Sequence, residues 1–212
     1  MITHTTTPDL LDLLDWKRRI FDLYRAVRSS PDAETVWTQW RRTRDELFAG
    51  HPQSPIPEAK RAAFEELPFF DFDPSARVLA EVAPAEAQRY DIATSGDGAY
   101  SFTRFAEARF ELKGRPLSLE LYWLDGYGGG LFLPFRDGTS GRSTYGAGRY
   151  LLDTVKGADL GTDGSRLVLD FNFAYNPSCS YDPQWVCPLA PPTNRLSVAI
   201  EAGERYGSQP SR

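Results

Sequence analysis

The feature that most constrains the fold is a pair of alternating segments on either side of Gly114-Arg115. A period of two in the side chains indicates β-strands with one buried face. A glycine in the first position of a two-residue turn is typical of a type II′ hairpin. The pattern therefore predicts a long antiparallel hairpin whose apolar face carries Tyr100, Phe102, Ala106, Ala108, Phe110 and Leu112, then Leu117, Leu119, Leu121 and Trp123.

Further short segments have the length and composition of strands. They are bounded by turn residues such as Asp137-Gly138 and Asp163-Gly164, and no helical pattern separates them. Together with the hairpin they predict about eight strands in a largely antiparallel, strongly curled or barrel-like sheet. The expected strands are residues 77–82, 88–93, 131–135, 149–155, 166–173 and 194–201.

The N-terminal quarter has a helical period instead. Apolar residues at steps of three and four run along 9–28, and a second stripe follows Ser30-Pro31-Asp32 and stops at Gly50. Two amphipathic helices joined by a short turn predict a helical hairpin that must dock on another surface. The two stripes are Leu13, Trp16, Ile20, Leu23 and Val27, then Val36, Trp37, Trp40, Leu47 and Phe48.

These patterns predict a mainly β, α+β protein that folds as a single unit. We expect an N-terminal helical hairpin over residues 1–50 and a proline-rich connector over 51–75, with a short helical turn at 58–66. The antiparallel β domain then covers 76–206, and 207–212 form a tail.

The balance of charge argues against several kinds of partner. There are 24 basic and 29 acidic residues, a net charge of −5, which disfavours nucleic acid. No apolar run is long enough to span a membrane, and the N-terminus lacks a secretory leader pattern. We therefore expect a cytoplasmic protein without nucleic-acid or membrane partners. Nothing in the pattern indicates an oligomeric state.

The scarcity of histidine and cysteine limits the chemistry further. The chain has His4, His51, Cys179 and Cys187, too few for a typical zinc site, so we expect no metal. Two buried free thiols are favoured for the cysteines, and a disulfide that closes their loop is the alternative. The sequence also lacks a P-loop, a nucleophile elbow and a dinucleotide fingerprint, so we expect no cofactor. Carboxylate, arginine and tyrosine chemistry remains, or binding alone.

Polar residues are dense at the end of the expected strand 166–173. Asp170 and Asn172 share one strand face, and Tyr175 and Asn176 follow before Pro177. If that face points into a barrel, the four line a cavity. If it points to solvent, the segment is an ordinary outer strand.

Arg149 is the second candidate. It lies between Tyr145 and Tyr150, and an arginine among aromatic residues needs an acidic partner or an anionic ligand. Asp137 or Asp170 is the expected partner, in which case the pair is a buried structural ion pair.

The same segments carry a family resemblance. The runs LFLPFRDGTSGRSTYGAGRY, LDFNFAYNPSCSYDPQWVCPLAPPTNRL and VAIEAGE, together with WTQWRRTRDELFAGHPQSPI, resemble the domain-of-unknown-function family 1684 over residues 16–204. The chain differs from that family's usual pattern at Ala190 and Thr193. The resemblance implies an uncharacterised bacterial protein and no known reaction. It also implies that the polar residues belong to a signature: Asp137, Thr139, Thr144, Tyr145, Gly148, Arg149, Tyr150, Asp170, Asn172, Tyr175, Asn176, Asn194 and Glu201.

Three functions follow from these residues. The first is a small-molecule pocket anchored by Arg149 and lined by Tyr145, Asp170, Asn172, Tyr175, Asn176 and Asn194. The second is a hydrolase or isomerase in which Asp170 or Asp137 is the general base and Arg149 stabilises charge. The third is a structural or interaction module with Trp16, Trp37 and Trp40 partly exposed.

Overall fold

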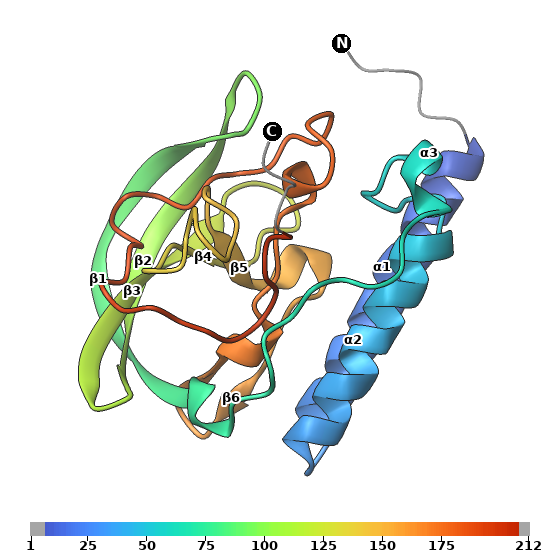
Figure 1. Ribbon diagram of the computed structural model, residues 1–212. Coiled ribbons are helices and arrows are strands. Elements are labelled where there is room, and N and C mark those ends of the chain that lie inside the picture. The colour runs from blue at the N-terminus through green and yellow to red at the C-terminus, as the bar shows by residue number, and fades with distance from the viewer. Residues whose placement is uncertain (1–6, 208–212) are drawn as a thin grey trace.

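A helical hairpin stands beside a curled antiparallel sheet in the computed structural model (Figure 1). The structure describes residues 7–207, so His4 and most of the expected tail lie outside it. The long strands curve along the side of the molecule away from the hairpin, and shorter strands and loops lie between them and the helices. The mainly β, α+β class predicted from the sequence is confirmed.

The helices follow the predicted stripes closely. Helix α1 spans Thr7–Ser29 and α2 spans Ala33–Gly50. Asp32 caps α2 by accepting a hydrogen bond from the backbone N–H of Thr35 at 3.0 Å. The expected turn at 58–66 is a shorter helix, α3 (Glu58–Arg61).

Seven strands form one sheet in the order β5-β4-β3-β2-β1-β7-β6, and every neighbouring pair is antiparallel. The described residues hold seven strands rather than eight, and the end strands β5 and β6 do not pair with each other, so closure into a barrel is not confirmed. The strands are β1 (Arg77–Ala93), β2 (Ala99–Leu112), β3 (Arg115–Leu124), β4 (Leu131–Phe135), β5 (Arg149–Asp153), β6 (Thr162–Asp163) and β7 (Arg166–Asp170).

Several predicted strand boundaries were wrong. The segments 77–82 and 88–93 are one strand with an irregularity between Pro84 and Gln88. The strands expected at 149–155 and 166–173 stop early, because 3₁₀ turns η2 (Thr154–Lys156) and η3 (Phe171–Phe173) follow them. Segment 194–201 is irregular. Its backbone groups bond to residues 136–138 and to a buried arginine, so they are not free to form a ladder. Two further 3₁₀ turns are η1 (Pro74–Ala76), just before β1, and η4 (Ser178–Ser180), after β7.

The turn of the long hairpin lies one residue earlier than predicted. Leu112 pairs with Arg115, so the two turn residues are Lys113 and Gly114, with φ of 51° and 73°. Two positive φ values define a type I′ turn instead of the predicted type II′ turn. Lysine adopts the left-handed region here although glycine and asparagine do so more readily.

A β-bulge changes which residues of the hairpin are buried. Arg104 pairs with Tyr122 but Ala106 pairs with Leu121, so Phe105 is an extra residue in β2. Beyond the bulge the buried face of β3 moves from odd to even positions. Tyr122 is therefore buried, and Trp123, which was predicted to be buried, is 47 % exposed.

The helical hairpin and the sheet share one hydrophobic core. Trp40 is fully buried, with its ring edge-on to Phe173 of η3 at 5.2 Å between centroids. Trp37 donates its indole N–H to the backbone carbonyl of Asn172 at 3.0 Å. The expectation of partly exposed helix tryptophans is therefore wrong for Trp37 and Trp40, because both face the β domain. Among residues 7–207, no helix is long and apolar enough to cross a membrane.

Candidate functional site

Arg149 lies inside the protein and its partners are internal. Its guanidinium forms an ion pair with Asp137 at 2.7 Å and donates to the carbonyls of Ile200 (3.0 Å), Glu204 (3.3 Å) and Ala202. The side chain is 1 % exposed. This is the structural ion pair that the sequence offered as the alternative to a ligand anchor.

The loop between β4 and β5 supports that ion pair. Asp137 also accepts hydrogen bonds from the backbone and hydroxyl of Thr139. Gly148 has a φ of 101°, and a Cβ there would lie 2.6 Å from the carbonyl oxygen of Phe135. The glycine thus lets the backbone pass close to β4 just before Arg149. These signature residues hold the loop in place.

Asn172 and Asn194 act as clamps between distant segments. Asn172 accepts from the backbone N–H of Asp73 and donates to its carbonyl, at 2.9 and 2.8 Å. Asn194 does the same with Glu120, at 2.8 and 3.0 Å, and also donates to the carbonyl of Pro134. Each side-chain amide makes the two hydrogen bonds, to a backbone N–H and a backbone carbonyl, that a neighbouring strand would otherwise make.

Asp170 contacts Asn172, whereas Tyr145 lies elsewhere, beside Cys179. Asp170 caps η3 through the backbone N–H of Asn172 at 3.1 Å, and burial raises its pKa. It lines a polar cavity of about 370 Å³ that also includes Arg77. The Tyr145 hydroxyl lies 3.9 Å from the sulfur of Cys179. The predicted residues therefore do not form one pocket.

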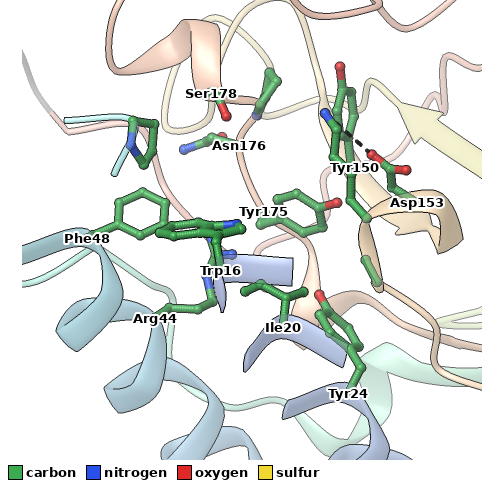
Figure 2. Close-up of a pocket in the computed structure, with 14 residues that line it drawn as sticks. Trp16, Ile20, Tyr24, Arg44, Phe48, Tyr150, Asp153, Tyr175, Asn176 and Ser178 are labelled. Atoms are coloured by element: carbon green, nitrogen blue, oxygen red, sulfur yellow. Dashed lines mark ion pairs between the residues drawn. The ribbon is translucent and has the colours of Figure 1, made fainter. Parts of the chain in front are cut away.

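Two of them, Tyr175 and Asn176, do line a cavity of about 80 Å³ between the hairpin and the β domain. In Figure 2, side chains of α1 and α2 form one side of it, and Tyr150, Tyr175 and Asn176 form the other. The complete lining is Trp16, Ile20, Tyr24, Arg44, Phe48, Pro55, Tyr150, Asp153, Lys156, Ala158, Tyr175, Asn176, Pro177 and Ser178.

A buried ion pair stands at the helix side of this cavity. Arg44 of α2 pairs with Glu204 at 3.2 Å, and Glu204 accepts further hydrogen bonds from Asn176 and Tyr181. The guanidinium also lies 5.1 Å from the ring centroids of both Phe48 and Tyr175. Burial is the largest influence and opposes the charge of Arg44, but Glu204 and the neighbouring tyrosines together outweigh it, so the pKa of Arg44 is raised. Burial raises the pKa of its partner Glu204, and Arg44 together with the hydrogen bonds to Glu204 opposes that shift.

Three residues of this lining carry a buried polar atom without a hydrogen-bond partner in the described part of the chain. Within residues 7–207, the Tyr24 hydroxyl, the Arg44 Nε and the Asn176 Oδ1 have no hydrogen-bond partner. Their side chains are at least nine-tenths buried, with Tyr24 at 1 %, Asn176 at 3 % and Arg44 at 5 % exposure. A buried polar group without a partner costs about 1–3 kcal/mol, so three in one lining require an explanation.

Asp153 marks the far side of the cavity. Burial raises its pKa, and its ion-pair partner Lys156 is 3.8 Å away. The two residues also line a second, mostly apolar cavity of about 150 Å³, whose other members include Phe102, Phe132 and Val186. The end of β5 therefore separates a polar aromatic cavity from an apolar one.

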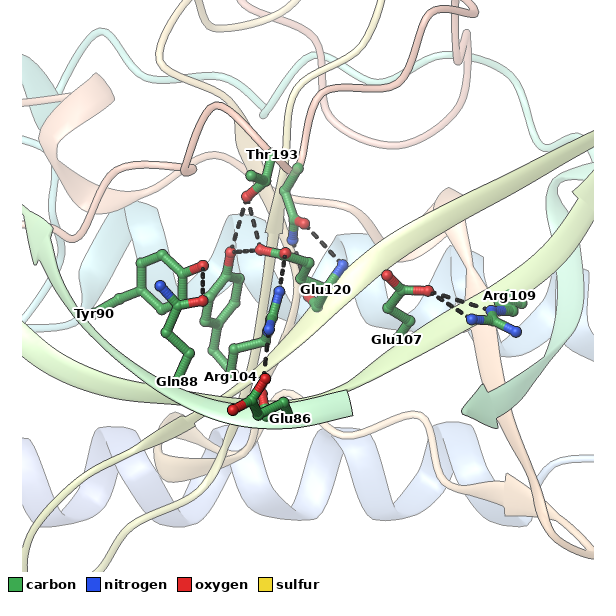
Figure 3. Close-up of polar contacts among 10 residues, drawn as sticks. Glu86, Gln88, Tyr90, Arg104, Glu107, Arg109, Glu120 and Thr193 are labelled. Carbon is green, nitrogen blue, oxygen red and sulfur yellow. Dashed lines mark hydrogen bonds and ion pairs between the residues drawn. The ribbon is translucent and has the colours of Figure 1, made fainter. Parts of the chain in front are cut away.

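A separate polar cluster on β2 and β3 was not predicted (Figure 3). Glu120 pairs with Arg104 at 3.0 Å and accepts from the hydroxyls of Tyr122 and Thr193. Burial acts to raise the pKa of Glu120, but these hydrogen bonds outweigh it, so its pKa is lowered. The cluster fastens the C-terminal segment to the sheet. Within the described chain no three His, Cys, Asp or Glu side chains form a group that could hold a metal ion.

Sequence reasoning missed Tyr24, Arg44 and Glu204. A signal existed for the first two. Arg44 occupies the apolar stripe of its helix, four residues from both Trp40 and Phe48, and Tyr24 lies four residues after Ile20. A charged residue on a buried stripe indicates a buried partner or a site. Glu204 gave no such signal, because it lies in an irregular segment.

Comparison with known proteins gives a family without a described activity. The model of the family described as "Protein of unknown function (DUF1684)" matches residues 62–205, which include the β domain but not the helical hairpin. No curated protein matches the chain. It is similar to an uncharacterised protein from Haloarcula marismortui with a solution NMR structure, at 38 % identity and a TM-score of 0.59. That similarity covers 81 % of this chain and 93 % of the other.

Proposed function

Because this chain belongs to the DUF1684 family, which is described only as of unknown function, we propose a function from its own geometry. The proposal is that the protein binds a small, uncharged, planar molecule, or a planar group of a larger one. The site is the cavity between the helical hairpin and the β domain. We further propose that it does so in a reducing compartment such as the cytoplasm, where its two free thiols persist.

The observation that carries the proposal is the set of unpartnered polar atoms in an aromatic lining. Arg44 Nε offers a donor, Asn176 Oδ1 an acceptor and the Tyr24 hydroxyl either. Their combined cost falls away when a bound group supplies the missing hydrogen bonds. Binding sites commonly combine aromatic walls with a few polar groups in this way.

The charge and the volume of the cavity limit the kinds of ligand that fit it. Arg44 is neutralised by Glu204, and Lys156 lies beside Asp153, so the lining carries no excess charge for an ionic ligand. Trp16, Phe48 and Tyr175 provide flat apolar surfaces. A volume of about 80 Å³ holds a few waters or part of a small planar group. An aromatic amide fits these limits, since it has an acceptor for Arg44 and a donor for Asn176.

The proposal retains Tyr175 and Asn176 from the predicted pocket and replaces Arg149 with Arg44 as the central arginine. It is a binding function rather than catalysis. Asp137 is committed to Arg149 and Thr139, and Asp170 lies in another cavity. Neither carboxylate is available to a ligand at Arg44.

The proposal is tested by titrating the ¹⁵N-labelled protein with benzamide and following the amide resonances of residues 175–178. We expect saturable shifts there and weaker shifts with benzoate, whose charge finds no partner. Tyr24→Phe should weaken benzamide binding about five- to tenfold, as expected for one lost hydrogen bond. Tyr150→Phe is the matched control, because Tyr150 lines the same cavity but donates its hydroxyl to the carbonyl of Pro188. Shifts confined to other regions, or equal effects of both variants, would contradict the proposal.

A further inference from the structure

The two cysteines lie together in the loop of residues 175–192. Both thiols are free and buried. The backbone N–H of Cys179 donates to the sulfur of Cys187 at 3.4 Å, so the two cysteines are in direct contact. They are eight residues apart, and the loop between them contains Pro183 and bonds to itself, as in Trp185 N–H to the carbonyl of Asp182. The fold thus holds the two cysteines against each other.

The surroundings of the two thiols differ. Polar neighbours, of which Cys187 has the largest effect, lower the pKa of Cys179 to about 6. The neighbouring Cys179 and burial both raise the pKa of Cys187. Cys179 is therefore the thiol of the two that ionises more readily. A thiolate beside a second thiol is the arrangement that redox-sensitive cysteines use.

We propose that Cys179 and Cys187 are a reversible redox pair that closes to a disulfide when Cys179 reacts with a hydroperoxide. The Cys179 thiolate attacks the terminal peroxide oxygen, the O–O bond breaks, and the product is a sulfenic acid plus the alkoxide or hydroxide of the peroxide. The sulfur of Cys187 then attacks the sulfenic sulfur, forming the S–S bond and releasing water, which carries the thiol proton and the sulfenic oxygen. Two thiols are oxidised and one peroxide is reduced.

The disulfide would form in the loop that borders both cavities. Ser178 lines the cavity beside Arg44, whereas Val186 and Pro188 line the apolar one. The bond would join these two walls directly. The chemistry depends only on the sulfurs and their neighbours, so it does not require a bound ligand.

The test is to treat the fully reduced protein with one equivalent of hydrogen peroxide, unfold it, add iodoacetamide and measure the intact mass. We expect a monomer that has lost two hydrogens and takes up no iodoacetamide, and dithiothreitol should restore two alkylatable thiols. Cys187→Ser should stop at a sulfenic acid that dimedone traps. Cys179→Ser should leave Cys187 reduced over the same period.

The wild-type protein alone shows whether the internal disulfide forms, even if a serine variant folds poorly. Two alkylated cysteines after peroxide treatment, or oxidation of each sulfur without an internal bond, would overturn the proposal. A disulfide-linked dimer would also overturn it. Faster oxidation of Cys179→Ser than of Cys187→Ser would reverse the assigned roles and contradict the argument from their surroundings.

Discussion

Two buried arginines show why the chemistry of one residue type depends on its remaining donors. Arg149 and Arg44 both pair with a buried carboxylate. Arg149 also donates to three backbone carbonyls, whereas the Nε of Arg44 has no partner within residues 7–207. A satisfied guanidinium stabilises the fold, and one with a free donor beside a cavity is suited to a ligand. The sequence placed Arg149 among aromatics and offered Asp137 as its ion-pair partner, but its carbonyl partners come from residues 200–204, too distant in sequence to be predicted.

The structural role of Arg149 predicts a large effect on stability. Arg149→Met leaves the carboxylate of Asp137 buried and unpaired, so we expect the free energy of unfolding to fall by about 3–5 kcal/mol. Urea unfolding followed by circular dichroism measures it. Arg109→Met is the control, because Arg109 is exposed and pairs only with Glu107, and its effect should stay within about 0.5 kcal/mol. Equal stability of the two variants would show that Arg149 does not hold the fold.

The unpartnered hydroxyl of Tyr24 predicts an effect of unusual sign. Tyr24→Phe removes a buried group without a hydrogen bond, so the ligand-free protein should gain about 1 kcal/mol of stability. Tyr150→Phe removes a hydroxyl that is bonded to Pro188 and should lose a similar amount. Chemical denaturation of both variants checks this. A loss of stability in Tyr24→Phe would show that its hydroxyl is already satisfied.

At the scale of single elements, local periodicity was informative wherever the chain is regular. Helices α1 and α2 and strand β4 lie where the patterns placed them, because each buries one continuous face. The bulge at Phe105 and the irregular segment 194–201 were missed because they depend on partners across the sheet and on buried side chains. The cavity was missed for the same reason, since its lining comes from both helices and from the segments after β5 and β7.

The type I′ turn of the long hairpin predicts opposite effects at its two positions. Lys113→Asn should stabilise the protein by about 0.5 kcal/mol, because asparagine adopts a positive φ more readily than lysine. The lost contact of Lys113 with Asp73 is an exposed ion pair of little value. Gly114→Ala should destabilise it by about 1 kcal/mol through strain alone, since no atom lies within 4 Å of the added Cβ. Thermal unfolding shows whether each variant is more or less stable than the wild type. A stabilising effect of Gly114→Ala would exclude this turn geometry.

The cluster around Glu120 predicts a pH dependence. Its pKa is lowered from the usual 4.5, so its contribution to stability is complete above that pH and is lost as the pH falls through the lower folded value. Glu120→Gln should be roughly 1–2 kcal/mol less stable than the wild type at pH 7. The difference should shrink below pH 4.5, which urea unfolding at several pH values measures. A gap that stays constant down to pH 3 would contradict the lowered pKa.

For the whole molecule, the shared core makes the hairpin and the β domain interdependent. Trp37 and Trp40 face the β domain, so their fluorescence reports on docking, and far-ultraviolet circular dichroism reports on the secondary structure of both parts. We expect the two signals to give one coincident transition in urea. Fluorescence changing at a lower urea concentration than circular dichroism would mean that the hairpin undocks first. The sequence predicted the two parts and their contact, but not that a cavity remains between them.

The central claim is that this cavity is a binding site rather than a place for structural water. High-resolution crystal structures of the protein grown with and without benzamide test it most directly. We predict that the ring lies between Trp16 and Tyr175, that its amide contacts Arg44 Nε and the Asn176 side chain, and that any waters seen there without benzamide are displaced. The same ordered waters bridging Tyr24, Arg44 and Asn176 in both crystals would contradict it, because water would then satisfy these groups as part of the fold.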